Sequence, residues 1–195
     1  MKQLSNDIKD LFTIIIRQET KRYENGFDKE KIIENSTQIN RDFSIMVSPS
    51  NNHLHNALRL LFKIDEIVEN DQKIEIEIKF DRLPQILLIM INRTLQQNGN
   101  LIKNHNTLLI PPHQKVGFKT YKLFASVIHH GNSLTNGHYS AFIQIDNRWF
   151  EFNDSDVFQV NFKRVKKISK GYENSSVELA VHIDNLKHDE IIKTE

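Results

Sequence analysis

The feature that most restricts the fold of this chain is a strict alternation of apolar and polar residues over positions 73–80. Ile74, Ile76, Ile78 and Phe80 are each separated by one charged residue. Because successive side chains of a strand point to opposite faces, this period of two predicts a half-exposed β-strand. The continuous apolar run at 86–91 predicts a second strand, buried on both faces.

The rest of the chain is also dominated by strand patterns. Asp146-Asn147 is a turn pair between two β-forming runs, which predicts a hairpin. Three stretches differ: 95–106 is polar and Asn-rich and predicts a loop, whereas apolar spacing predicts helices at 5–22 and 54–62. The remaining predictions are strands at 31–47, 121–129, 138–145, 148–153 and 177–183, with a helical or irregular stretch at 155–168. This order predicts an α+β fold with a mostly antiparallel sheet.

Composition narrows the class of protein. The chain has 195 residues, enough for one domain with a sizeable core. Its 26 basic and 25 acidic residues give a net charge of +1, which argues against nucleic acid and anionic membranes as partners. The longest apolar run, 86–91, is too short to cross a bilayer. We therefore expect an intracellular protein in the cytoplasm or nucleus.

The sequence contains no cysteine. Disulfides, thiolate metal sites and a thiol nucleophile are therefore all excluded for this chain. Any hydrolytic chemistry that it supports must use another nucleophile or one supplied from outside the chain.

One segment carries a specific pattern. Residues 121–160 read YKLFASVIHHGNSLTNGHYSAFIQIDNRWFEFNDSDVFQV. They contain an aromatic-led strand, a His-x-Gly turn, Gly-His-Tyr, a Trp, and Phe-Asn-Asp before an apolar strand. In order and spacing this segment resembles the His box of ubiquitin-specific proteases, the ubiquitin carboxyl-terminal hydrolases of the peptidase C19 type.

Weaker similarity to the same family extends along the chain. Residues 83–93 (LPQILLIMINR) resemble its Leu-Pro-led core strand, and 34–47, 54–62 and 176–183 resemble flanking elements. The resemblance implies a papain-like cysteine-protease fold whose palm and fingers are present and whose thumb is largely missing. It predicts a helical segment at 1–29, a truncated protease-like domain at 30–185 and a charged tail at 186–195.

The resemblance also assigns a candidate catalytic site. It implies that His138 is the base of a Cys-His-Asn/Asp triad, that Asn153 orients its ring, and that Asp154 assists. Since His138 begins one predicted strand and Asn153 ends the next, a tight hairpin brings them opposite each other. Without a cysteine they form a retained half-triad. The alternative is structural: the His138 ring hydrogen-bonds a carboxamide and rigidifies the hairpin.

By the same resemblance, the segment before His138 faces the C-terminal tail of ubiquitin. The tail-binding candidates are Ser133, Asn136, Gly137 and Tyr139. An ordinary turn and a strand aromatic explain the same residues equally well. Gly137 is also explained by a backbone that needs positive φ or close approach.

Other residues have simpler explanations. The stretches 33–36 and 70–75, where the family carries paired zinc-binding cysteines, offer no thiolates here. His129 and His130 lack a third ligand at a recognisable spacing, so no metal or cofactor is expected. Trp149 is expected to be a partly buried core anchor, and the basic run 163–167 a solvated helix face.

These observations favour a catalytically inactive protein of ubiquitin-specific-protease type that binds ubiquitin or ubiquitinated proteins, or acts as a scaffold in a larger complex. The alternative is a fragment or half of an active cysteine deubiquitinase, which removes ubiquitin from proteins with a cysteine supplied by a missing segment.

Overall fold

A computed structural model describes residues 2–24, 31–49, 53–70, 72–169 and 175–184. The chain divides into two compact units, one of Met1–Phe43 with Arg59–Pro84 and one of Ser44–Leu58 with Gln85–Glu195. The predicted domain boundaries, near 29 and 185, and the tail at 186–195 lie outside the described residues. No helix in the described part of the chain is long and apolar enough to span a membrane.

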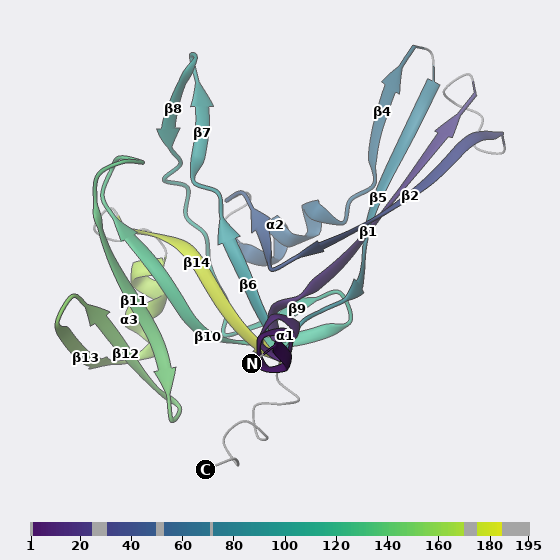
Figure 1. Cartoon of the computed structure of the whole chain (residues 1–195). Coiled ribbons are helices and arrows are strands. Elements are labelled where there is room, and N and C mark those ends of the chain that lie inside the picture. The colour runs from purple at the N-terminus through teal and green to yellow at the C-terminus, as the bar shows by residue number, and fades with distance from the viewer. Residues whose placement is uncertain (1, 25–30, 50–52, 71, 170–174, 185–195) are drawn as a thin grey trace. The chain divides into compact units, whose positions relative to one another are not determined.

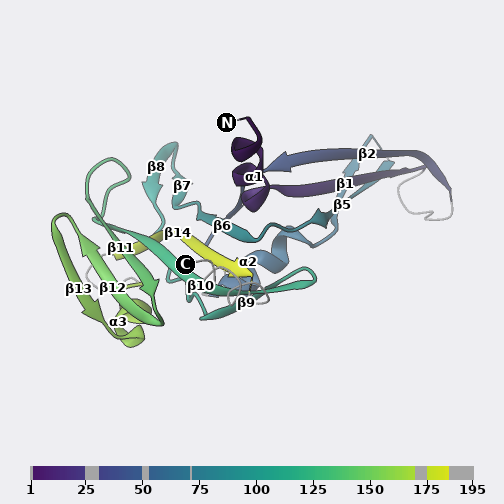
Figure 2. The same cartoon turned by 60° about the horizontal axis from the view of Figure 1, so that its bottom comes forward.

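The first unit is built on a four-stranded antiparallel sheet in the order β2-β1-β5-β4 (Figure 1). The predicted alternating strand forms β5, which pairs with β1 along nearly its whole length and with β4 over its first half. Figure 2 shows α1 beside the ends of β1 and β2. The elements are α1 (Lys2–Phe12), β1 (Ile14–Tyr23), β2 (Ile32–Asp42), β4 (Asp65–Glu69) and β5 (Gln72–Arg82).

The helix predicted at 5–22 is wrong over its second half. The helix ends at Phe12, and β1 begins at Ile14. The run Ile14-Ile15-Ile16 is β-branched, and β1 forms ladders with β2 on one side and β5 on the other. Charged pairs across the ladder, such as Lys79 Nζ to Glu19 Oε2 at 2.8 Å, add to this pairing. Tertiary pairing therefore outweighs the helical spacing of the apolar residues.

The second unit contains an eight-stranded sheet in the order β13-β12-β11-β10-β14-β6-β3, with β9 paired to β10. Every pairing is antiparallel except that of β3 with β6. This confirms the predicted α+β class and mostly antiparallel sheet. The strands are β3 (Ser44–Val47), β6 (Ile86–Ile91), β9 (His113–Val116), β10 (Lys119–His130), β11 (His138–Ile145), β12 (Arg148–Asn153), β13 (Asp156–Val160) and β14 (Ser175–Asp184).

The predicted strand at 86–91 is confirmed as β6, but its burial on both faces is wrong. Leu87, Ile89 and Ile91 are buried, whereas the side chain of Met90 is 43% exposed. One face of β6 therefore contributes to the core, and the other is only partly covered. The buried face belongs to a core that also contains Leu108, Ile128, Phe142, Val177 and Ala180.

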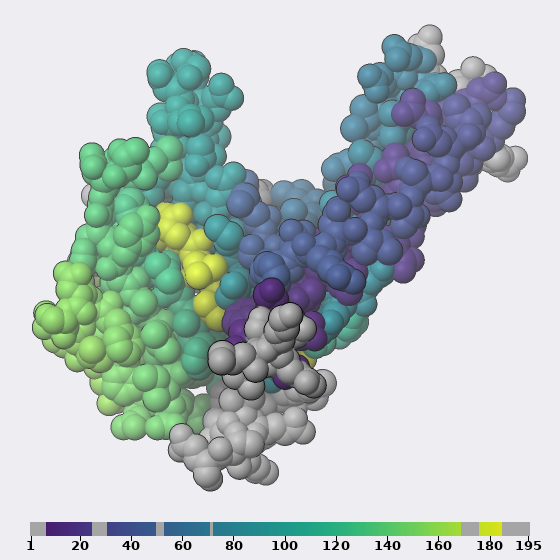
Figure 3. Space-filling view, in the orientation of Figure 1, coloured from purple at the N-terminus to yellow at the C-terminus, as the bar shows by residue number. Residues whose placement is uncertain are grey.

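The loop predicted at 95–106 contains a hairpin of β7 (Thr94–Gln97) and β8 (Asn100–Lys103). Its turn residues Asn98 and Gly99 have φ of 50° and 78°, as a type I′ turn requires. The Asn-Gly pair is a strong hairpin signal that the polar composition of the segment obscured. The hairpin stands out from the rest of its unit in Figures 1 and 3.

Two further helices, both short, lie in the described part of the chain. The predicted helix at 54–62 is confirmed as α2 (Leu54–Leu61), and α3 (Phe162–Ser169) follows β13. On α3, Val165 and Ile168 are buried, while the side chains of the basic run face outward as predicted. Trp149, 7% exposed, packs against Phe162 at 5.6 Å between ring centroids, which confirms it as a core anchor.

Candidate functional site

The structure brings His138 and Asn153 into direct contact. His138 begins β11, Asn153 ends β12, and the hairpin between them turns at Asp146-Asn147 with φ of 48° and 60°. Nε2 of His138 hydrogen-bonds Oδ1 of Asn153. Because an amide oxygen only accepts, Nε2 must donate, and a neutral ring then carries its lone pair on Nδ1.

This arrangement presents a base. The His138 side chain is 45% exposed. Asp154 follows directly at the turn after β12, and its Oδ2 lies 3.9 Å from Nε2 of His138. That separation is too long for a hydrogen bond, and the Asp154 side chain is 82% exposed. In this arrangement Asn153 orients the ring through Nε2, and Nδ1 is the nitrogen that can accept a proton.

The two neighbouring histidines are occupied by hydrogen bonds. His130 lies opposite His138 in the β10–β11 ladder, with ring centroids 6.1 Å apart, and its Nε2 is 2.7 Å from Oγ of Ser140. His129 is buried, and its Nδ1 is 2.5 Å from Nζ of Lys103. Protein partners therefore account for both residues, and the metal alternative is not needed to explain them.

The loop between β10 and β11 has a glycine at each end, where the backbone passes close to other atoms. A Cβ at Gly131, where φ is 144°, would lie 2.9 Å from the Asn136 carbonyl oxygen. A Cβ at Gly137 would overlap the His129 ring and lie 2.5 Å from the His130 carbonyl oxygen. Of the two explanations for Gly137, close approach therefore holds, and the positive φ belongs to Gly131.

The predicted tail-binding residues all lie on this loop and at the start of β11. Oγ of Ser133 accepts from the Thr135 backbone N–H at 3.1 Å, so this hydroxyl shapes the loop. Asn136 is exposed. The Tyr139 side chain is 57% exposed, and its ring lies 4.7 Å from the His129 ring. These groups form one continuous segment that leads directly to His138.

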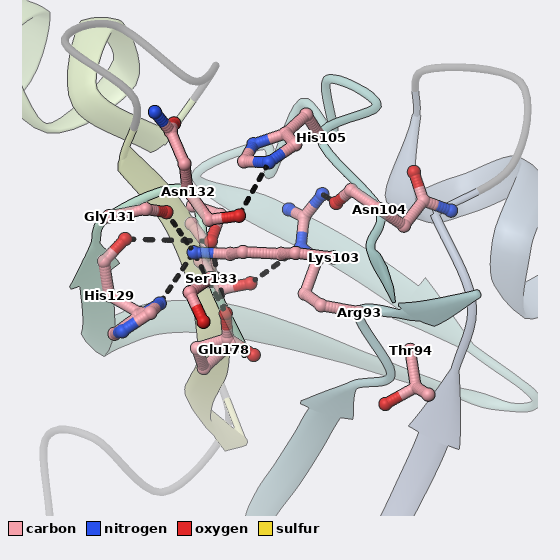
Figure 4. A network of polar contacts seen from close by, with 12 residues as sticks. Arg93, Thr94, Lys103, Asn104, His105, His129, Gly131, Asn132, Ser133 and Glu178 are labelled. Carbon is pink, nitrogen blue, oxygen red and sulfur yellow. Dashed lines mark hydrogen bonds and ion pairs between the residues drawn. The ribbon is translucent and has the colours of Figure 1, made fainter. Parts of the chain in front are cut away.

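A buried polar network behind this loop was not predicted from the sequence (Figure 4). Nζ of Lys103 lies 2.5 Å from Nδ1 of His129, donates to the Gly131 carbonyl at 2.8 Å, and is 4.0 Å from Glu178. Burial lowers the pKa of Lys103 and raises that of Glu178. Burial, followed by the charge of Lys103, lowers the pKa of His129. The missed signal was the Asn98-Gly99 turn, because the hairpin places Lys103 here.

Comparisons with known proteins agree with this geometry. A family model described as ubiquitin carboxyl-terminal hydrolase matches residues 1–178. Ubiquitin carboxyl-terminal hydrolase 10 of Mus musculus is 33% identical over 116 residues, which are 49% of this chain and 15% of that protein. Ubiquitin carboxyl-terminal hydrolase 3 of Homo sapiens is 44% identical over 52 residues, 27% of this chain and 10% of that protein.

Among solved structures, a SAGA DUB module of Ubp8, Sgf11, Sus1 and Sgf73 bound to monoubiquitin contains a similar chain. The TM-score is 0.76 at 19% identity, over 90% of this chain and 41% of the other. A Ubp8-Sgf11-Sgf73-Sus1 module gives 0.73 at 19% identity, over 90% and 40%. The chain thus spans 15% or less of the two curated relatives and about two fifths of the similar structures. These findings confirm the ubiquitin-specific-protease fold class predicted from residues 121–160.

Proposed function

This chain belongs to the ubiquitin carboxyl-terminal hydrolase family, and on that premise we propose that it binds ubiquitin without cleaving it. One observation carries the proposal: the His138–Asn153 pair is assembled in a sequence that contains no cysteine. The family's chemistry needs a thiolate beside the imidazole. The His138–Asn153 pair without a thiolate, which we call the half-site, supports recognition and not bond cleavage.

The hydroxyls of the loop and of β11 do not replace the missing thiol. Oγ of Ser140 hydrogen-bonds Nε2 of His130, and Oγ of Ser133 hydrogen-bonds within the loop. A serine nucleophile also needs hydrogen-bond donors arranged around the developing oxyanion. We therefore expect no hydrolysis by this chain alone.

The loop 131–137 supports tail recognition. Asn136, Gly137 and Tyr139 are all exposed. An extended peptide can lie along such an exposed backbone, while an aromatic ring provides contact area at a low entropy cost. The Ubp8 module of similar fold was solved bound to monoubiquitin. We propose that the tail of ubiquitin lies along Gly137 and Tyr139.

Titration of the isotope-labelled chain with ubiquitin tests this proposal. We expect saturable changes in the amide signals of residues 131–139, with a Kd below about 1 mM. Ubiquitin that lacks its C-terminal tail should bind more weakly and leave these signals nearly unchanged. Spectra that do not change at millimolar ubiquitin would refute binding.

Two matched variants locate the surface. Tyr139→Ala and Val157→Ala each remove an exposed apolar side chain from a strand of the same unit, 57% and 52% exposed respectively. We expect the first to weaken ubiquitin binding and the second to leave it unchanged. Equal effects would place the binding surface elsewhere.

The second candidate function is one half of an active cysteine deubiquitinase, whose cysteine comes from another segment. The hydrogen bond of His138 favours it, because Asn153 uses Nε2 and leaves Nδ1 as the nitrogen that can accept a proton. Incubation with a fluorogenic ubiquitin C-terminal substrate, beside His138→Ala, separates the two. We expect no release from the chain alone. Release that disappears in His138→Ala would overturn the inactive proposal.

A further inference from the structure

We propose that Lys103 is a positioning residue that fixes both ends of the loop 131–137, and thereby the backbone from Gly137 to Tyr139. The inference rests on the proposed function where it concerns the ubiquitin tail. We call the contacts of Lys103 with Gly131 and His129 the clamp, and they are a property of the free chain. Figure 4 shows the Lys103 side chain extended from the end of β8 toward Gly131 and His129.

Lys103 holds the start of the loop directly. Its side chain is 1% exposed, and Nζ donates to the Gly131 carbonyl at 2.8 Å. The next residues of the same segment add a second contact, because Nε2 of His105 lies 3.3 Å from the Asn132 carbonyl oxygen. The end of β8 and the segment after it thus contact two consecutive carbonyl groups at the start of the loop.

Lys103 holds the end of the loop through His129. An ammonium only donates, so Nδ1 of His129 must accept, and a neutral ring then carries its proton on Nε2. The lowered pKa of His129 agrees with a neutral ring. That edge of the ring occupies the space a side chain at Gly137 would need, and the ring centroid lies 4.7 Å from that of Tyr139. Ring orientation therefore sets the path of Gly137.

The segment that carries Lys103 is itself held rigid. The guanidinium of Arg93, a buried residue, donates to the carbonyls of Val177 at 3.2 Å, Asn104 at 3.3 Å and Asn106 at 2.5 Å. The Asn104 backbone N–H donates to the Arg93 carbonyl at 2.6 Å. These bonds tie the base of the hairpin to β14, so the lysine has a fixed origin.

Burial of a lysine ammonium group costs free energy unless polar partners compensate for the lost hydration. Desolvation disfavours the cation, and the carboxylate of Glu178 offsets it from 4.0 Å. Without Lys103, the Gly131 carbonyl and Nδ1 of His129 lose their donor. The polar clamp therefore specifies one loop conformation where an apolar side chain would not. A loop fixed before binding loses less conformational entropy when the tail arrives.

The test uses Lys103→Met beside Lys119→Met. Lys119 is a matched control, because its Nζ pairs with the Asp184 carboxylate at 2.7 Å in the same unit without contacting the loop. Hydrogen exchange and amide signals are measured in the free chain. We expect Lys103→Met to increase exchange over 131–137 and shift the Gly137 and Tyr139 signals, whereas Lys119→Met leaves them unchanged. Loop signals that match wild type in Lys103→Met would overturn the inference.

The binding arm measures the ratio of the Kd for ubiquitin without its tail to the Kd for intact ubiquitin. We expect this ratio to fall about tenfold in Lys103→Met, with little change in the Kd for ubiquitin without its tail. An unchanged ratio would overturn the role in tail binding. If wild type binds no ubiquitin, the proposed function fails, and the loop signals of the free chain still decide the clamp.

Gly137→Ala provides a second variant, in which the Lys103 side chain itself is unchanged. The added methyl group displaces the His129 ring, and the disturbance should pass through Nδ1 to Lys103. We expect shifted signals for the Lys103 ammonium and the Asn104 amide. Unchanged signals at both positions would mean that the ring does not couple the two ends of the loop, and would overturn the inference even if Lys103→Met does not fold.

Discussion

His182 shows how burial decides the chemistry of a single residue. It lies in β14 with a fully buried side chain, and burial lowers its pKa to about 4. In an unfolded chain the same ring titrates near pH 6.5. The folded protein therefore keeps this histidine neutral at pH values where the unfolded chain already binds a proton.

The pH dependence of stability follows from this difference. A base with a lowered folded pKa contributes stability that is complete above the unfolded pKa and is lost as pH falls toward the folded one. Between about pH 6.5 and about pH 4 the unfolded chain binds more protons than the folded one. The free energy of unfolding should therefore decrease as the pH is lowered, by about 1.4 kcal/mol per pH unit at most. Urea unfolding of wild type and His182→Leu across this range measures the contribution.

The pH profile of His182→Leu should be flatter than that of wild type. His113→Gln, at an exposed histidine, is the control and should retain the wild-type slope. Parallel profiles for wild type and His182→Leu would show that other groups cause the pH dependence.

At the scale of elements, a charged pair adds to the apolar contacts that attach α3 to the sheet. Glu151 of β12 is 5% exposed and receives two hydrogen bonds from Arg164 of α3, at 2.5 Å and 3.0 Å. The Trp149–Phe162 ring contact lies beside this pair along the same two elements. A bidentate arginine fixes the helix in direction as well as position.

Removal of that arginine should loosen the helix. Arg164→Met leaves a buried carboxylate without its guanidinium, and we expect a loss of about 2 kcal/mol, below the range for fully buried pairs because Arg164 is half-exposed. Lys163→Met, at the exposed neighbour, should change stability by less than about 0.5 kcal/mol. Chemical denaturation measures both. Equal losses would show that Glu151 does not depend on Arg164.

At the scale of the whole molecule, the two units differ in how their strands are covered. In the second unit, β10 and β14 lie in the interior of the sheet and carry buried residues such as Leu123, Ile128 and Val177. In the first unit, β2 is an edge strand whose side chains are almost all exposed. Local stability should therefore vary strongly along the chain.

Hydrogen exchange read by mass spectrometry checks this expectation. Amides of β10 and β14 should exchange slowest, and those of β2 should exchange fastest among strands even though β2 pairs along its length with β1. Edge strands open without disturbing the rest of a sheet, whereas interior strands open only with larger units. Protection of β2 equal to that of β10 would contradict the prediction.

The sequence by itself determined the features that depend on near neighbours. The period of two at Ile74–Phe80 predicted β5, and Asp146-Asn147 predicted the hairpin that joins His138 to Asn153. Both are local, because side-chain alternation and turn chemistry act over a few residues. The resemblance of residues 121–160 to a known family was readable for the same reason, since its motifs lie within one short stretch.

Only the tertiary structure decided the features that depend on distant partners. The segment at 14–23 became a strand because β2 and β5 pair with it, and β5 lies more than fifty residues later. Lys103 reached Gly131 across 28 residues of sequence, and no local pattern announced that contact. Pairing and burial depend on which surfaces meet after folding. For this reason the contact between His138 and Asn153 was predicted from the sequence, and the contacts of Lys103 were found only in the structure.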